Sequence, residues 1–159
     1  MNFLKKISFA VLSGFLLYSN VSFAESIAFD KGQLATVKTQ NMGKQWLMLL
    51  WSVDCPPCFK ELAIIQKLQR QHNDLAVVII NTDANDEVKT ERTEIIEKFE
   101  LGSTTHFHFI DGQGDQSRFH IDSHWYGELP RSYFVASDGQ SHGKSGLVNQ
   151  STLTKWLVN

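Results

Sequence analysis

Two short segments of the sequence are almost entirely apolar, and they predict the centre of a sheet. The first runs from Trp46 to Trp51, within a strand expected over residues 45–51, and the second from Leu75 to Ile80. Neither segment alternates between apolar and polar residues, which is typical of strands covered by helices on both faces. The sequence therefore predicts an α/β fold in which these two strands are parallel neighbours.

The residues between these strands predict an amphipathic helix that opens at the first cysteine and ends near His72. From Phe59 to Leu68, apolar residues recur at every third or fourth position and mark one face. Two parallel strands joined by a helix form a β-α-β unit with a right-handed crossover. This helix is therefore expected to pack on one face of the sheet.

A second helix is predicted over residues 85–100, with a cap at Leu101-Gly102. Its apolar residues again fall on one face. Its charged residues are expected to face solvent and carry no assigned function: Asp86, Glu87, Lys89, Glu91, Arg92, Glu94 and Glu97.

The rest of the chain predicts shorter elements. Residues 26–39 are weakly patterned and fit a short edge strand or an irregular lead-in. The C-terminal third predicts a strand over 105–110, a short helix over 116–121 with Phe119 inward, a strand over 131–135, a turn at 137–140, an antiparallel strand over 141–148 and a helix over 150–158. Together these elements predict a central mixed sheet flanked by helices.

His106 and His108 alternate with apolar residues and are expected to share one face of their strand. A metal site there is one interpretation. A solvated sheet face is favoured instead, because no third ligand lies nearby in the sequence. We therefore predict no metal at these histidines.

The first 24 residues have the parts of a signal peptide. Two lysines precede an apolar stretch over residues 7–18, and Ser22-Phe23-Ala24 offers the small residues that signal peptidase requires. Cleavage after Ala24 would leave residues 25–159 as a single domain. An uncleaved membrane anchor is the alternative, although the apolar stretch is short for a span. A periplasmic location is predicted.

Charge argues against one class of partner. The net charge of the whole chain is −2, and it becomes −4 without residues 1–24, which contain two lysines and no acidic residue. A mildly acidic protein is a poor ligand for nucleic acid. We expect no nucleic-acid partner and a monomer.

The only two cysteines of the chain, Cys55 and Cys58, enclose Pro56 and Pro57 at the point where the first strand passes into the helix. A Cys-x-x-Cys at such a junction is typical of thioredoxin-like redox proteins. The positive end of a helix favours the thiolate, which is the reactive form. We expect an exposed Cys55 to attack a partner disulfide and a more buried Cys58 to resolve the mixed disulfide.

Other roles for the cysteine pair stay open. A structural disulfide with this spacing closes a small loop and removes little entropy from the unfolded chain. A zinc site needs further ligands, and no second pair exists at the required spacing. A copper-binding or chaperone protein that uses both cysteines and a histidine is the alternative from another functional class.

Two further residues have a structural and a functional interpretation. Glu61 lies one helical turn after Cys58, either as a solvated charge or as a carboxyl that exchanges a proton with the buried sulfur. Pro130 directly precedes the strand over 131–135. The Leu129-Pro130 bond is either an ordinary trans peptide or a cis peptide beside the cysteines.

The order of elements and these motifs resemble the thioredoxin superfamily, and most of all the exported TlpA/ResA-type thiol-disulfide oxidoreductases. The resemblance covers residues 30–158. It includes Trp51, the run Cys55-Pro56-Pro57-Cys58, Glu61, and Pro130 with the following strand up to Asp138-Gly139. The helix and strand over 85–110 resemble this family's insertion after the second core strand.

The resemblance implies the roles of several residues. Pro130 would be a cis-proline beside the active site, with Leu129 at the substrate-binding surface, and Glu61 would be the active-site acid. The substrates would be protein thiols and disulfides, including the cysteines of apocytochrome c. The redox-active disulfide would be the only redox group, without another cofactor.

The direction of electron flow is not fixed by the motif. The family is associated with reduction, and no histidine lies between the cysteines to favour a strong oxidant. A reductase outside the cytoplasm needs electrons from a membrane thiol reductase, whereas an oxidase or isomerase does not. One residue departs from the family pattern: Asp54 replaces the usual tryptophan before Cys55, and its carboxylate opposes thiolate formation.

Overall fold

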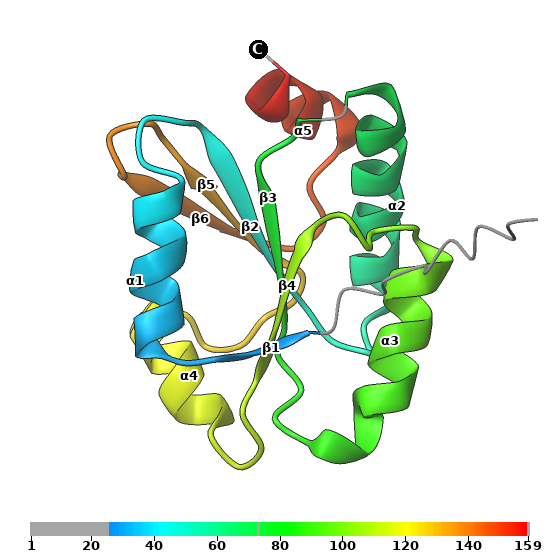
Figure 1. Ribbon diagram of the computed structural model, residues 1–159, viewed down its shortest axis with the longest axis vertical. Coiled ribbons are helices and arrows are strands. Elements are labelled where there is room, and N and C mark those ends of the chain that lie inside the picture. The colour runs from blue at the N-terminus through cyan, green and yellow to red at the C-terminus, as the bar shows by residue number, and fades with distance from the viewer. Residues whose placement is uncertain (1–25, 73, 159) are drawn as a thin grey trace, which may run out of the picture.

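The computed structural model describes residues 26–72 and 74–158, so the predicted signal peptide lies outside the described residues. Figure 1 shows a central sheet with helices on both sides. In chain order the elements are β1 (Ile27–Phe29), α1 (Lys31–Gln40), β2 (Trp46–Trp51), α2 (Pro56–Gln71), β3 (Val77–Asn81), η1 (Asp86–Val88), α3 (Lys89–Lys98), β4 (Thr105–Phe109), α4 (Gly114–Ile121), β5 (Arg131–Val135), β6 (Ser141–Ser145) and α5 (Gln150–Leu157). Among the described helices, none has both the length and the apolar character needed to span a membrane.

The six strands form one mixed sheet in the order β1-β4-β3-β2-β5-β6. β2 is parallel to β3 and antiparallel to β5. The pair β3–β4 and the pair β4–β1 are also parallel, whereas β6 returns antiparallel beside β5. The predicted parallel β2-α2-β3 unit is confirmed. β2 lies inside the sheet, and the two cysteines follow its carboxyl end.

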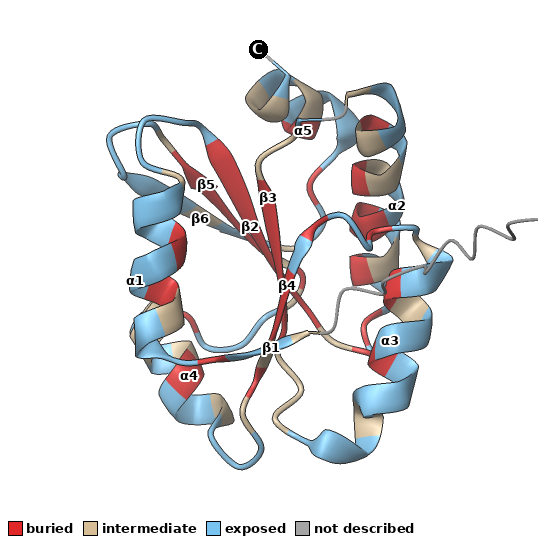
Figure 2. Cartoon of the chain, viewed as in Figure 1, coloured by how far each residue is buried: buried red, intermediate tan, exposed pale blue. Residues whose placement is uncertain are grey.

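The sheet has an apolar cluster on each face. Alternate residues of β2 divide between the clusters, with Leu47, Leu49 and Trp51 on one side and Trp46, Met48 and Leu50 on the other. The first cluster lies under α2, α3 and α5, and the second under α1 and α4 (Figure 2). All six residues of β2 are buried, which explains why the segment is apolar without alternation.

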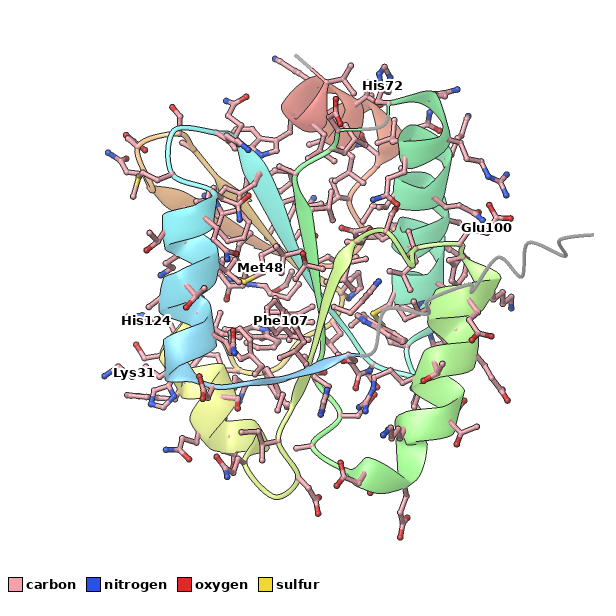
Figure 3. The ribbon with its side chains drawn as sticks, in the orientation of Figure 1. Lys31, Met48, His72, Glu100, Phe107 and His124 are labelled. Atoms are coloured by element: carbon pink, nitrogen blue, oxygen red, sulfur yellow. A yellow bond between two sulfur atoms is a disulfide. The ribbon has the colours of Figure 1, made fainter. Side chains whose placement is uncertain are left out.

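Residues 26–39 contain a short edge strand, β1, as one of the two expectations had it, but helix α1, which follows β1, was not predicted. Asp30 caps this helix, because its carboxylate accepts the N–H of Gln33 at 2.8 Å. Leu34 and Val37, three positions apart, are the buried residues of α1. They cover the second apolar cluster, in which Met48 and Phe107 lie between α1 and the sheet (Figure 3).

The helix predicted over 85–100 is divided and ends differently from the expectation. A short 3-10 turn, η1, precedes α3, which ends at Lys98. Glu100 adopts a left-handed backbone with φ 52°. Its N–H donates to the Glu97 carbonyl at 2.9 Å, and the Leu101 N–H donates to the Ile96 carbonyl at 3.1 Å. This is a Schellman motif, so the cap is centred on Glu100 and not on Leu101-Gly102.

Three predicted side-chain environments were wrong. Arg92 was expected in solvent but is buried, with only 3% of its surface exposed. His106 was expected on a solvated face but is buried beneath the helices, where it hydrogen-bonds the Leu101 carbonyl at 2.7 Å. Phe119 was expected inward but is 65% exposed, and Ser117 is the buried residue of α4. In each case the spacing of apolar residues identified the helix or strand, but it did not determine which of its faces is buried in the fold.

Candidate active site

Cys55 and Cys58 form a disulfide at the start of α2, with their Cα atoms 5.2 Å apart. Cys55 is the N-cap residue of the helix. In this oxidised form Cys55 is 6% exposed and Cys58 is fully buried. The first cysteine is therefore the more accessible one, although it is much less exposed than the sequence suggested.

The first turn of α2 leaves few hydrogen-bond donors for a thiolate at Cys55. Pro56 and Pro57 have no N–H group. The N–H groups of Cys58 and Phe59 both donate to the carbonyl of Cys55, at 2.9 and 3.3 Å. The positive end of the helix therefore acts on the Cys55 sulfur mainly through its dipole, because the nearest backbone donors are engaged elsewhere.

The loop between β2 and the cysteines is fixed by Asp83, which follows β3. One carboxylate oxygen of Asp83 accepts the hydroxyl of Ser52 at 2.7 Å. The other accepts the N–H of Val53 and the side-chain amide of Asn81, both at 2.8 Å. The buried Arg92 guanidinium lies 3.4 Å from the Asn81 side-chain oxygen. This network ties the segment that enters the cysteine motif to the neighbouring strand.

Glu61 is a fully buried carboxyl one helical turn after Cys58. One of its oxygens accepts the hydroxyl of Ser132 in a short hydrogen bond, and the other accepts the N–H of Val148 at 3.0 Å. Burial raises the pKa of Glu61, although both hydrogen bonds and the charge of Lys144 act in the opposite direction. The interpretation of Glu61 as a solvated charge is therefore wrong.

The two partners of Glu61 suit a carboxyl that changes its protonation state. A backbone N–H can only donate, so Val148 holds an oxygen of Glu61 in either state. A hydroxyl both donates and accepts. Ser132 can donate to the carboxylate and, after a rotation of its O–H, accept from the protonated carboxyl. A proton can therefore enter or leave Glu61 while both of its oxygens keep a hydrogen-bond partner.

The Leu129-Pro130 peptide bond is cis, as the resemblance implied. In the β2–β5 register Leu50 lies opposite Arg131. Pro130 directly precedes Arg131, so it lies beside the end of β2 that leads to the cysteines. Leu129 packs against both apolar clusters. The structure thus brings Trp51, Pro130 and the cysteine motif to the same end of the sheet.

The loop before the cis peptide is held by Asp122. Its carboxylate accepts the Arg131 guanidinium at 3.0 Å and the Tyr133 hydroxyl at 3.1 Å. Partial burial of Asp122 opposes ionisation, but hydrogen bonds from the His124 N–H, Tyr133 and Arg131 hold its pKa below the usual value. An ionised Asp122 therefore joins the end of α4 to β5 across the proline loop.

Asp54 is exposed, and its N–H donates to the Ser52 hydroxyl at 3.2 Å. Burial lowers the pKa of His106 and of His108. Within the described residues, no group of three or more His, Cys, Asp or Glu side chains is arranged to hold a metal ion.

Three residues of the site were missed from the sequence. Ser132 is a fully buried polar residue of β5. A hydroxyl next to the apolar run of a strand is a usable signal, because a buried polar group needs a partner. Asp83 lies two residues after β3, and Asp122 directly follows α4. Their roles depend on contacts between segments that only the fold brings together.

Comparisons with known proteins place this geometry in a fold family. No protein-family model and no curated protein matches the sequence. A secreted disulfide oxidoreductase of Mycobacterium tuberculosis, homologous to E. coli DsbE, has 20% identity and a TM-score of 0.57, covering 76% of this chain and 84% of that one. StoA from Bacillus subtilis has 23% identity and a TM-score of 0.54, covering 74% and 85%.

A thiol:disulfide interchange protein of the thioredoxin family from Chlorobium tepidum is also similar in structure. It has 15% identity and a TM-score of 0.56, and the alignment covers 74% of this chain and 80% of that chain. At such identities the similarity concerns the fold. The chain has a thioredoxin-like α/β fold, with a central mixed sheet flanked by helices and a Cys55–Cys58 disulfide at the carboxyl end of β2.

Proposed function

We propose that this protein is an exported thiol-disulfide oxidoreductase of the TlpA/ResA type that reduces disulfides in protein substrates. The observation that carries the proposal is the Cys55–Cys58 disulfide at the N-terminus of α2, at the same end of the sheet as the cis Leu129-Pro130 bond. The similar solved structures include a secreted disulfide oxidoreductase and a thiol:disulfide interchange protein, which supports the same chemistry.

The reaction is an exchange of two electrons between dithiol and disulfide. In the reduced protein, the Cys55 thiolate attacks one sulfur of a substrate disulfide, forming a mixed disulfide and releasing one substrate thiolate. Cys58 loses its proton and attacks the Cys55 sulfur, which releases the second substrate thiolate and forms the Cys55–Cys58 disulfide. The substrate gains two electrons and two protons, and a membrane thiol reductase is the proposed donor that restores the dithiol.

Glu61 is proposed to accept and return the proton of Cys58. Its position one turn after Cys58 and its complete burial support this role. A carboxyl with a raised pKa is a better proton acceptor than an exposed one. The reversible hydrogen bond with Ser132 would keep it satisfied while the proton moves.

Three features favour reduction over oxidation. The first is that the two prolines of the first turn of α2 have no N–H group. The second is that the next two N–H groups donate to the Cys55 carbonyl, and the third is the negative charge of Asp54 beside Cys55. All three reduce the stabilisation of the Cys55 thiolate. A less stable thiolate disfavours the reduced protein, so the dithiol is the stronger reductant.

Trapping tests the role of each cysteine. Cys58→Ala is expected to accumulate mixed disulfides with a reducible protein substrate through Cys55, whereas Cys55→Ala, as the matched control, is not. Non-reducing electrophoresis detects the adducts. Equal trapping by both variants, or tight stoichiometric Cu(I) binding without insulin-reductase activity, would contradict the proposal and favour the copper-binding alternative.

The direction is tested by the equilibrium reduction potential of Cys55–Cys58 against glutathione. We expect a value nearer to about −270 mV, as in thioredoxin, than to about −120 mV, as in a strong disulfide oxidase. A potential close to the oxidase value would instead support a periplasmic oxidase or isomerase.

A further inference from the structure

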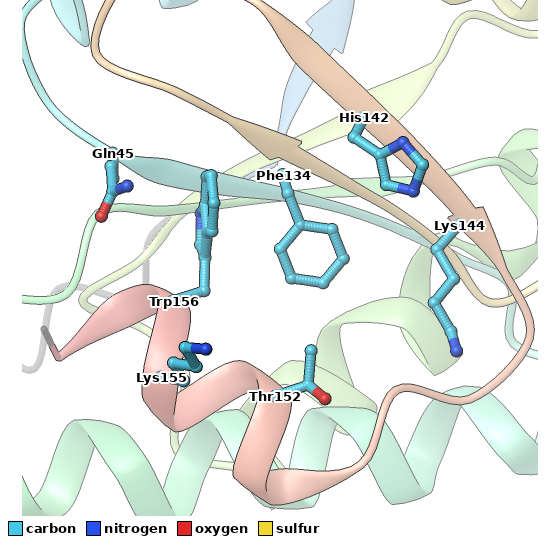
Figure 4. Close-up of a pocket in the computed structure, with 7 residues that line it drawn as sticks. All are labelled: Gln45, Phe134, His142, Lys144, Thr152, Lys155 and Trp156. Atoms are coloured by element: carbon cyan, nitrogen blue, oxygen red, sulfur yellow. The ribbon is translucent and has the colours of Figure 1, made fainter.

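A hollow of about 670 Å³ lies between α5 and the β5–β6 hairpin. Figure 4 shows the side chains around it, which come from both elements and from Gln45, the residue before β2. Its lining residues are Gln45, Phe134, His142, Lys144, Thr152, Lys155 and Trp156. Its volume is within the usual range of small-molecule sites.

The apolar wall of this hollow is held in place. The rings of Phe134 and Trp156 meet edge to face, with centroids 5.5 Å apart. The Trp156 indole N–H donates to the Trp46 carbonyl at 3.1 Å, and Leu153 of the same helix is fully buried. The Asn149 side chain caps α5 by accepting the Thr152 N–H at 2.9 Å. Phe134 is buried, with 7% of its surface exposed, and supports the partly exposed Trp156 ring, which offers a preorganised aromatic surface.

The rim of the hollow is basic. Lys144 and Lys155 approach it from opposite sides, one on β6 and one on α5, and His142 is the third basic residue (Figure 4). The lining contains no acidic side chain. Within the described residues, neither lysine makes an ion pair. The chain as a whole is slightly acidic, so this local concentration of positive charge sets the hollow apart.

The aromatic wall and the basic rim together favour a ligand that has both a flat apolar body and a negative group. A flat apolar body can stack on or against the rings, and a negative group can reach the two ammonium groups. The aromatic wall of the hollow lies at the far end of β2 from the cysteines, because Trp156 contacts the first residue of β2 whereas the cysteine motif follows its last. Lys144, on the rim, is also the lysine whose charge acts on the pKa of Glu61. We propose that this hollow binds a small organic anion with a flat aromatic body, such as an aromatic carboxylate.

The test compares two probes of nearly the same shape, one charged and one neutral. The oxidised full-length protein, labelled with ¹⁵N, is titrated with 2-naphthoate and with its neutral amide, 2-naphthamide, in low salt. With 2-naphthoate we expect shifts at the Trp156 indole N–H and at the backbone N–H groups of Lys144 and Thr152. The amide should bind about five-fold more weakly, as expected for the loss of an ion pair near the surface, and high salt should remove most of the difference.

Lysine variants test whether Lys144 and Lys155 cause the difference in affinity between the two probes. Lys144→Gln combined with Lys155→Gln should weaken 2-naphthoate binding about five-fold or more and leave 2-naphthamide unchanged. Lys98→Gln on α3 is the control, because Lys98 lies outside the hollow, and it should leave both affinities unchanged.

Three results would overturn the proposal. The first is equal affinity for the two probes, and the second is an equal effect of Lys98→Gln. The third is a set of shifts confined to Ser141, Gly143 and Ser145, along β6, which would indicate pairing with an extended peptide or a second copy at the sheet edge.

Discussion

At the scale of single residues, Glu61 makes the stability of the fold depend on pH. Its pKa is raised by burial above the ordinary value of 4.5. A carboxyl with a higher pKa in the folded state stabilises the fold fully below the unfolded pKa, and this contribution is lost as the pH rises through the folded pKa. Each unit of difference between the two pKa values corresponds to about 1.4 kcal/mol.

We therefore predict that the wild-type protein loses stability relative to Glu61→Gln between pH 4 and pH 8. The variant has no ionisable group at this position, and its amide can still accept from Val148 and donate to Ser132. Urea unfolding of the oxidised proteins across this pH range measures the difference. Glu94→Gln, at an exposed position of α3, is the control. If the difference in the free energy of unfolding between wild type and Glu61→Gln does not vary with pH, folding does not shift the pKa of Glu61.

Asp83 gives a second prediction at this scale. Asp83→Ala removes the acceptor for the Ser52 hydroxyl, the Val53 N–H and the Asn81 amide. We expect a loss of about 2 kcal/mol in the free energy of unfolding, because partly buried donors are left without a partner. Thermal or urea unfolding measures it.

The matched control for Asp83 is Asp111→Ala, in an exposed turn, which should change stability by less than about 0.5 kcal/mol. We also expect slower disulfide exchange in Asp83→Ala, because the loop before Cys55 loses its anchor. Equal stability of the two variants would mean that the Asp83 hydrogen bonds are replaced by water at no cost.

The sequence predicted the cysteines as a redox pair from their spacing and from their position after an apolar strand. It left Glu61 open, because helical spacing places a residue on a face but does not say what covers that face. Burial of Glu61 depends on β5 and on the segment after β6, whose residues Ser132 and Val148 lie 71 and 87 positions away. Asp83 and Asp122 were missed for the same reason.

At the scale of elements, the strands were predicted better than the helix ends and caps. Strands β2 and β3 were recognised because their residues are almost all apolar and buried on both faces, and β5 was recognised from the run Tyr133-Phe134-Val135 after Pro130. Helix α1 was missed because only Leu34 and Val37 of its ten residues are buried, so its apolar pattern is weak. The Asp30 cap was the available signal, since Asp is a preferred N-cap residue.

The end of α3 leads to a prediction about one backbone angle. Glu100 occupies a left-handed conformation that glycine adopts without a steric penalty. Its carboxylate also pairs with Arg70 at 2.7 Å, but both side chains are largely exposed, so this pair contributes little. We expect Glu100→Gly to raise the free energy of unfolding by about 0.5 kcal/mol.

The same change inside α3 is the control. Glu97→Gly lies within the helix, where glycine is expected to cost about 1 kcal/mol. Urea unfolding of both variants measures whether each substitution raises or lowers the free energy of unfolding. If both substitutions destabilise the protein equally, the left-handed position is not a source of strain.

At the scale of the whole molecule, redox state and stability are linked. The disulfide joins residues three positions apart, and a loop of this size corresponds to about 2 kcal/mol of stabilisation in the chain-entropy relation. A protein whose disulfide form is the more stable one is a reductant, whereas a strong oxidant is more stable when reduced. We predict that the oxidised protein is more stable than the reduced one by about 2 kcal/mol.

Urea unfolding with and without a dithiol reductant measures this difference. The double variant Cys55→Ala with Cys58→Ala should have the same stability under both conditions, which separates the effect of the disulfide from that of the reductant. Greater stability of the reduced protein would reverse the proposed direction of electron flow.

The start of α2 has a consequence for how a partner leaves. Two proline rings with restricted φ and the two N–H bonds to the Cys55 carbonyl fix the backbone on which both sulfurs are mounted. We therefore expect that opening the disulfide needs only side-chain rotation and that the oxidised and reduced proteins present nearly the same backbone to a partner. A change in the backbone of this protein would then not contribute to release of the product protein. Turnover then requires weak docking with a fast dissociation rate, so partner recognition must depend on the accessible sulfur more than on a large interface.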